Sequence, residues 1–202
     1  DYNHERLEYA VNKVIERQDA LRIVITDKYQ GVLEKVDYYK IKEYEIEDEE
    51  KLNNHLEKIR YEMKNEKLPV DKPPLFDIRI TRFKERAIMH CHFDCMMLDG
   101  WSQNLLLKEI LHYYISPDEE LEEIKIQYRD YILHKMNNVD NEKYEEDKNY
   151  WIDKFKNTSF VPEITLKTDP LSIKNPEIKQ FKTSITNEQW ENIKDNAKSF
   201  EV

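Results

Sequence analysis

Residues 94–102 read Asp94-Cys95-Met96-Met97-Leu98-Asp99-Gly100-Trp101-Ser102. Two aspartates stand five positions apart, between a segment typical of a β-strand and a segment typical of a helix. A charge at the end of a buried strand costs free energy unless something at that point requires it. We therefore look for chemistry at this turn.

The strand that leads into the turn has two different faces, because side chains alternate along a strand. One face carries Ile88, His90, His92 and Asp94, and the other carries Met89, Cys91, Phe93 and Cys95. The polar face either lines a cleft or is the solvated side of a sheet, and the spacing favours neither. At most two or three of these side chains could converge on a metal ion, so we expect no metal site. The two cysteines are interpreted as buried structural thiols, not as nucleophiles.

The sequence allows two interpretations of Asp99. It could be a turn residue and the N-cap of the helix that follows, but this does not explain Asp94. Two carboxylates at a strand end indicate either acid–base catalysis or a buried ion pair that fixes a site. An ion pair requires an arginine, and Arg17 and Arg22 flank a helix-to-strand junction.

Glycine occurs only at Gly31 and Gly100, so we expect the backbone to require glycine at these positions.

The rest of the chain alternates helical and strand-like patterns in a mixed order, which predicts an α+β fold with antiparallel hairpins. The expected helices are 7–17, 52–63, 101–110, 128–136, 144–155 and a last one capped by Thr186 and Gln189. The expected strands are 21–26, 32–36, 76–81, 87–94 and 181–185. The chain starts directly with a helix and stops inside a helical pattern, so it resembles a piece of a larger protein.

Composition narrows the class of protein. The 202 residues carry a formal net charge of −10, which disfavours nucleic acid and anionic membrane as partners. No apolar run reaches the roughly 20 residues of a membrane helix, and no secretory signal is visible. Two cysteines do not form a disulfide framework. These features predict a cytoplasmic protein.

The spacing Asp94-x4-Asp99-x2-Ser102 resembles the DxxxxDxxS signature of heterocyclization domains, which belong to the condensation-domain superfamily of nonribosomal peptide synthetases. Ordinary condensation domains carry HHxxxDG there, so Asp94 and Cys95 stand in place of the two histidines. Four further segments resemble superfamily motifs: Arg17–Arg22 (RHxxLR, with Gln18 for the histidine), Pro74–Arg79 (PLFxIR), Tyr128–Tyr131 (FRDY) and Tyr150-Trp151 (YW). The segment Phe160–Ile164 departs from the proline- and leucine-rich linker of heterocyclization domains.

This resemblance implies a fold like chloramphenicol acetyltransferase, in which each lobe is an α/β sandwich of helices on a mixed sheet. Residues 1–159 would be the N-terminal lobe without its first strand. Residues 160–180 would be the inter-lobe linker, and 181–202 the truncated start of the C-terminal lobe. The tunnel between the lobes would hold the active site.

The implied reaction joins a carrier-bound acyl or peptidyl thioester to carrier-bound Cys, Ser or Thr, then cyclodehydrates the amide to a thiazoline or oxazoline. The implied catalytic residues are Asp94, Asp99 and Ser102. Supporting positions are Gly100, Trp101, Arg17, Arg22 and His92. Asp99 resembles the family aspartate that pairs with an arginine of RHxxLR, and the aspartates look like organisers of the tunnel more than proton carriers.

The implied partners are upstream and downstream carrier domains, whose 4′-phosphopantetheine arms deliver the substrates, and an adjacent adenylation domain. No cofactor would bind the chain directly. A thiol titrates near ~8.5, so Cys95 cannot replace the second motif histidine as a base at neutral pH. The alternatives are a degenerate or ordinary condensation domain, or a non-catalytic lobe that docks carrier proteins.

Overall fold

The computed structural model describes residues 2–137, 141–156, 168–169, 172–174 and 181–200. The chain divides into two compact units, Asp1–Thr165 and Leu166–Val202. The helices of the first unit are α1 (His4–Arg17), α2 (Glu49–Asn65), α3 (Gly100–Ile115), α4 (Tyr128–Asn137) and α5 (Asn141–Lys156), with a 3₁₀ helix at Asp19–Arg22. Its strands are β1 (Ile23–Ile25), β2 (Gln30–Val32), β3 (Lys42–Ile46), β4 (Phe76–Phe83) and β5 (Arg86–Phe93).

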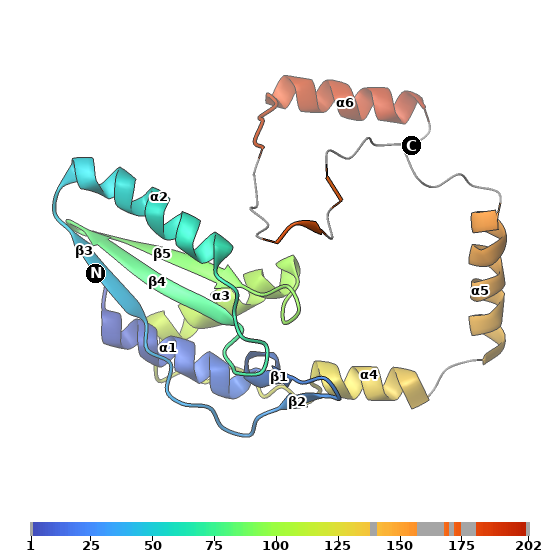
Figure 1. Ribbon diagram of the computed structural model, residues 1–202, viewed down its shortest axis with the longest axis horizontal. Helices are drawn as coiled ribbons and strands as arrows, with labels where there is room; N and C mark the ends of the chain where they lie inside the picture. The colour runs from blue at the N-terminus through green and yellow to red at the C-terminus, as the bar shows by residue number, and fades with distance from the viewer. Residues whose placement is uncertain (1, 138–140, 157–167, 170–171, 175–180, 201–202) are drawn as a thin grey trace. The chain divides into compact units, whose positions relative to one another are not determined.

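A mixed sheet in the order β3-β4-β5 organises this unit. Strand β3 runs parallel to β4, and β4 forms an antiparallel hairpin with β5, in which Thr81 lies opposite Ile88. Helix α2 covers one face of the sheet, and α1 and α3 cover the other (Figure 1). Strand β5 is therefore an outer strand, and its last residue leads directly into the turn at 94–99.

The hydrophobic core lies between the sheet and the α1–α3 pair. Most of its buried side chains come from α1, from the side of β4 that faces α1, and from α3: Leu7, Ala10, Val11, Val14, Ile15, Phe76, Ile78, Ile80, Leu106, Ile110 and Tyr113. The helical residues recur at three- and four-residue intervals, and the β4 residues recur at every second position. This agreement explains why these segments fold as a helix pair on a strand.

Two polar residues on the buried face of α1 hold the segment that enters β3. The carboxylate of Glu8 accepts the Ile41 amide at 2.9 Å and the Lys40 ammonium at 3.0 Å. The Asn12 side chain accepts the Tyr39 amide at 2.7 Å and donates to the Tyr39 carbonyl at 2.9 Å. Burial would raise the pKa of Glu8, but the Lys40 and Ile41 hydrogen bonds outweigh it and hold that pKa below its usual value.

Beneath α2, one threonine joins two histidines. The fully buried Thr81 hydroxyl lies 3.0 Å from the imidazole of His55 on α2 and 3.0 Å from that of His90 on β5. Burial lowers the pKa of His90 below 6.5, and the charges of Arg60, His55 and Arg79 lower it further. Protonated His90 is therefore disfavoured in the folded protein.

We expect the free energy of unfolding to decrease as the pH falls below 6.5. In this range the unfolded chain binds a proton at His90 that the folded chain does not, so protons favour unfolding. The contacts of Glu8 are lost only at lower pH, below 4.5, where its carboxylate becomes protonated. Denaturant melts between pH 7.5 and 5 measure the slope, which should be shallower in His90→Gln and unchanged in the exposed control His134→Gln. Equal slopes in all three proteins would contradict the assignment to His90.

Most expected elements of the first unit are present, with two differences. Residues 19–22 form a 3₁₀ helix, so the strand expected at 21–26 is reduced to β1, and the strand expected at 32–36 is reduced to β2. Strand β3 was not expected, because Lys42-Glu43-Tyr44-Glu45-Ile46 is a polar segment of low strand propensity. It forms because the backbone of β4 offers a parallel partner along Arg79–Phe83.

The second unit contains α6 (Asn187–Ser199), with the predicted capping box. The Thr186 amide donates to the Gln189 side chain at 2.8 Å, and the Gln189 amide donates to the Thr186 hydroxyl at 3.2 Å. The strand expected at 181–185 is wrong: this segment has no assigned secondary structure, and Phe181 is 94% exposed. A strand needs a hydrogen-bonded partner, and the described residues of this unit supply none. The linker expected at 160–180 lies mostly outside the described residues.

None of the described helices has both the length and the apolar character needed to cross a bilayer.

Candidate active site at the end of strand β5

The turn at 94–99 is held at its first end by Asp94. The Asp94 amide donates to the Leu75 carbonyl at 3.0 Å, which continues the pairing of β5 with the start of β4. One carboxylate oxygen of Asp94 accepts the Met96 amide at 2.8 Å, and the Asp94 carbonyl accepts the Met97 amide at 3.0 Å. Asp94 therefore folds the backbone of its own turn.

Asp99 holds the other end of the turn as the N-cap of α3. Its carboxylate accepts the Ser102 amide at 2.7 Å, in the position where a helix has an unpaired donor. Hydrogen bonds from the Ser102 amide and side chain lower the pKa of Asp99. Asp99 is therefore ionised at neutral pH and does not hold a proton that it could donate.

Buried side chains between the two aspartates fix the turn, and exposed ones surround it. Met97 and Leu98 are only 9% and 8% exposed and belong to the core cluster. Cys95 and Met96 are exposed, and Trp101, on the first turn of α3, is 85% exposed. The site thus presents an apolar surface next to two carboxylates that are engaged with backbone amides.

The expected ion pair between Asp99 and an arginine is wrong. Arg17 instead pairs with Glu109 on α3, at 3.2 Å between Nε and Oε1, and the side-chain Nε2 of Gln18 donates to the other oxygen at 2.8 Å. The Arg17 and Glu109 side chains are 17% and 10% exposed. Asp99 cannot take this place because it lies at the exposed start of α3, whereas Glu109 lies on the buried face of that helix.

Arg22 stabilises its own segment. Its guanidinium pairs with Asp19 at 2.7 Å and donates to the carbonyls of Ile15, Leu33 and Glu34. These contacts join the end of α1 to the chain that leaves β2. Arg22 is therefore a structural residue, and the structure does not bring it to Asp99.

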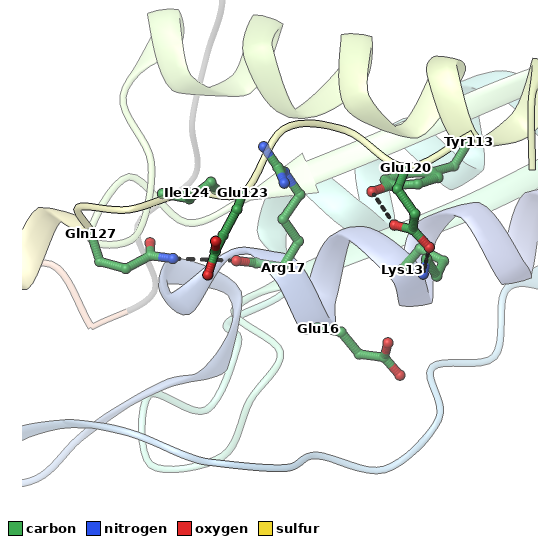
Figure 2. Close-up of a pocket in the computed structure, with 8 residues that line it drawn as sticks. All are labelled: Lys13, Glu16, Arg17, Tyr113, Glu120, Glu123, Ile124 and Gln127. Atoms are coloured by element: carbon green, nitrogen blue, oxygen red, sulfur yellow. Dashed lines mark hydrogen bonds and ion pairs between the residues drawn. The ribbon is translucent and has the colours of Figure 1, made fainter. Parts of the chain in front are cut away.

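Arg17 also lines a polar cavity of about 300 Å³ between α1 and the segment that follows α3 (Figure 2). Across this cavity Lys13 pairs with Glu120 at 2.6 Å, and the Tyr113 hydroxyl donates to the same carboxylate at 3.2 Å. Gln127 donates to the Arg17 carbonyl at 3.3 Å. The cavity is separate from the turn at 94–99, since none of its lining residues belongs to that turn.

Glu109 was not among the site residues predicted from the sequence, although its position in the helical pattern indicates that it is buried. Leu106, Ile110 and Tyr113 form the apolar stripe of α3 and are all buried. Glu109 falls on the same stripe, three residues after Leu106. A carboxylate on the buried face of a helix requires a partner. Arg17 and Arg22 were expected to pair with Asp99, so no partner was predicted for Glu109.

A comparison with protein families decides the identity of the fold. A sequence model described as "Condensation domain" matches residues 1–199. The chain belongs to the condensation-domain family. Its helices and mixed sheet are therefore those of a condensation domain, the α+β fold like chloramphenicol acetyltransferase that the motifs predicted.

Curated relatives of this condensation domain are much longer than the chain. It is 27% identical to bacitracin synthase 1 of Bacillus licheniformis over 202 residues, which are 98% of this chain and 4% of that protein. It is 24% identical to pyochelin synthetase PchF of Pseudomonas aeruginosa over 194 residues, which are 95% of this chain and 11% of that protein. The chain therefore spans a small part of these relatives.

Solved structures share the fold. The EpoB NRPS cyclization-docking bidomain from Sorangium cellulosum superposes with a TM-score of 0.79 at 23% identity, covering 98% of this chain and 40% of that one. The epimerization domain TycB3(E) of tyrocidine synthetase B superposes with a TM-score of 0.70 at 13% identity, covering 80% of this chain and 39% of that one. At these identities the likeness concerns the fold alone.

The polar face of β5 lines a cavity in part, as one of the two alternatives held, whereas the two cysteines of this condensation domain differ from expectation. His90 is buried under α2, and His92 is half-buried on the same face, where both line a small cavity, without Asp94. The expectation of buried cysteines is wrong, because Cys91 and Cys95 are both exposed. Cys91 lies on the outer strand, and the core residues under α1 and α3 come from β4. Among the described residues, no three His, Cys, Asp or Glu side chains cluster closely enough to hold a metal ion.

Gly100 has no conformational reason to be glycine. Neither glycine of the chain has a positive φ, so the expectation that the backbone requires glycine is wrong at both positions. The one described non-glycine residue with a positive φ is Lys84, in the β4–β5 turn. A Cβ placed on Gly100 would meet no atom within 4 Å, so the position borders open space at the start of α3.

The cap geometry predicts opposite results for two variants of Asp99. Asp99→Asn should unfold at the wild-type denaturant concentration, because an asparagine oxygen accepts the Ser102 amide as an aspartate oxygen does. Asp99→Ala should unfold at a lower concentration, because it leaves that amide without its partner. Denaturant melts of the two variants measure this. Equal and large losses in both would restore the ion-pair interpretation.

Proposed function

We propose that this chain is the N-terminal lobe of a heterocyclization domain in a nonribosomal peptide synthetase. The carrying observation is the turn at 94–99, where Asp94 and Asp99 each hold a backbone amide and the adjacent position is a cysteine. No imidazole is available at positions 94 and 95 to act as the base or positioning group of ordinary condensation. The similarity to a cyclization bidomain and to a pyochelin synthetase supports this subtype.

The proposed reaction has two stages. The amine of a carrier-bound Cys, Ser or Thr attacks the carbonyl carbon of the donor thioester, an amide bond forms, and the donor carrier leaves as its thiol. The side-chain thiol or hydroxyl then attacks the carbonyl carbon of the new amide. Loss of one water gives the thiazoline or oxazoline ring. Both stages need the two carrier arms held against each other, and such orientation supplies much of the rate.

In this proposal the motif residues shape the place where the arms meet. Asp94 and Asp99 are positioning residues, because their carboxylates are engaged by the amides of Met96 and Ser102 and fix the turn from both ends. The turn presents Trp101 and the open space beside Gly100 toward the substrates. Groups that move protons during cyclodehydration would come from the second lobe.

The proposed partners are carrier domains upstream and downstream, each with a 4′-phosphopantetheine arm, and a neighbouring adenylation domain that loads the acceptor. The arm is part of the substrate and is not a cofactor resident in this chain.

The product formed by the parent synthetase tests the proposal. The donor carrier is loaded with an acyl group, and the acceptor carrier is loaded in separate reactions with Cys, Ser, Thr or Ala. Intact-protein mass spectrometry should find, with at least one of Cys, Ser and Thr, a product lighter than the linear amide by one water. The Ala reaction should not lose water. Linear amide with every acceptor would indicate an ordinary condensation domain, and absence of transfer would indicate a docking lobe.

A further inference from the structure

A second cavity, of about 220 Å³, lies between α2 and the outer strand β5. It is lined by Arg60, Met63, Lys64, His90, Cys91 and His92. Among these described lining residues there are two permanent cations and two imidazoles, and no carboxylate. This composition is unusual in a chain whose net charge is −10.

The two cations of the cavity are unpaired within the described part of the chain. Arg60 and Lys64 stand one helical turn apart on α2, so both side chains reach the same face. No hydrogen bond or ion pair joins either of them to a described residue. Elsewhere on this helix, Lys51 lies 3.9 Å from Asp48 and Lys58 lies 3.8 Å from Glu62.

The imidazoles add hydrogen-bonding groups to the wall formed by β5. His90 is fixed by its 3.0 Å contact with Thr81. The Nδ1 atom of His92 is buried and has no hydrogen-bond partner among the residues that the structure describes. The carboxylate opposite His92 in the sheet, Asp77, is already engaged by the Tyr39 hydroxyl at 3.2 Å and by the Arg79 Nε at 2.6 Å. Asp77 is thus engaged elsewhere and is not free to neutralise the cavity.

The size and the positive charge of the cavity restrict the kind of ligand that it can bind. Pockets that enclose a drug-sized molecule measure about 300–1,000 Å³, so this cavity holds a group and not a whole nucleotide. Two adjacent cations with an imidazole beside them match the oxygens of a phosphate, since charge-assisted hydrogen bonds from Arg and Lys are the strong contacts to phosphate. A neutral imidazole keeps one N–H donor, so the site does not require protonated histidine.

We propose that the cavity between α2 and β5 binds a phosphate group, held by Arg60 and Lys64 at its rim with His92 beside it. The phosphate comes either from free inorganic phosphate or from the phosphodiester of a 4′-phosphopantetheine arm. The second source rests on the function proposed above, and the first does not.

The test uses the 202-residue chain with ¹³C-labelled histidine imidazoles, followed by NMR during a titration with inorganic phosphate at pH 7 and constant ionic strength. The signals of His90 and His92 should shift and saturate, while those of His112 and His134 stay in place. Arg60→Gln/Lys64→Gln should weaken binding by at least about tenfold, because two charge-assisted contacts are lost. The matched control Lys51→Gln/Lys58→Gln removes two charges from the same helix and should bind as the wild type does.

A second titration distinguishes the source. Tighter binding of 4′-phosphopantetheine than of inorganic phosphate assigns the site to the carrier arm, and equal binding assigns it to free phosphate. Pantetheine, which lacks the phosphate, should not bind in either case. The proposal is overturned by unsaturated shifts of all histidines, by unchanged binding in Arg60→Gln/Lys64→Gln, or by pantetheine binding as tightly as 4′-phosphopantetheine. Because no turnover is measured, such a failure leaves the proposed heterocyclization function intact.

Discussion

Replacing Glu109 by alanine is expected to lower the free energy of unfolding by about 3–5 kcal/mol, because breaking a buried ion pair leaves the other charge uncompensated. Arg17 would remain between α1 and α3 without its carboxylate, and Gln18 would lose its acceptor. Whole domains are stabilised by about 5–15 kcal/mol, so this single change removes a large part of the total. Chemical denaturation of the 202-residue chain measures it.

Two controls separate the ion pair from other effects of the substitution. Glu122→Ala removes an exposed carboxylate from the segment after α3 and should leave the unfolding midpoint unchanged. The apolar pair Arg17→Met/Glu109→Leu removes both charges together, and it should be more stable than Glu109→Ala alone, because no stranded guanidinium remains. A wild-type midpoint for Glu109→Ala would show that the α1–α3 packing does not depend on this pair.

The second large effect concerns catalysis by the chain alone. We expect the 202 residues to produce neither amide nor heterocycle from loaded carrier proteins. The chain covers 40% of the cyclization bidomain whose fold it shares, and in the proposed two-lobed domain it would supply only one wall of the tunnel that orients two thioester arms. Orientation of this kind is worth about 7–11 kcal/mol of barrier. Loaded carriers are incubated with the chain, and intact-protein mass spectrometry follows the acyl group.

The control for this experiment is the parent synthetase with the same carriers, which shows that the loaded substrates are competent. Acyl transfer by the 202-residue chain above the buffer background would contradict the prediction. It would also contradict the assignment of the chain to one lobe of a two-lobed domain.

The fold could be predicted wherever local pattern and tertiary packing agree. Helix α1 ends at Arg17 as expected, and the β4–β5 hairpin follows the alternation of Phe76, Ile78 and Ile80. Strand β3 was not predicted, because Lys42, Glu43 and Glu45 are charged and leave only Tyr44 and Ile46 as alternating, half-buried positions, too short a pattern to indicate a strand. The strand expected at 181–185 failed for the complementary reason: its pattern was suitable but no described partner pairs with it.

The site could be located from the sequence, but its contacts could not be assigned. Asp94 and Asp99 do end a strand and begin a helix, which the spacing indicated. The family resemblance predicted an ion pair between Asp99 and an arginine, whereas in the structure Arg17 forms its ion pair with Glu109. Which of two carboxylates reaches a guanidinium depends on which helix face is buried. The same limit applies to Cys91, whose exposure depends on its place in the outer strand.

We propose that the motif aspartates organise the turn and do not carry protons. It is tested most directly by the rate of product formation in the parent synthetase with Asp99→Asn and Asp99→Ala. Asparagine keeps the cap on Ser102 but cannot exchange a proton. We therefore predict that Asp99→Asn stays within about tenfold of the wild-type rate, since a general acid or base contributes about 10²–10⁴-fold, and that Asp99→Ala is slower than Asp99→Asn. A loss of about 10²–10⁴-fold in Asp99→Asn, equal to that in Asp99→Ala, would contradict the account and make Asp99 a proton carrier.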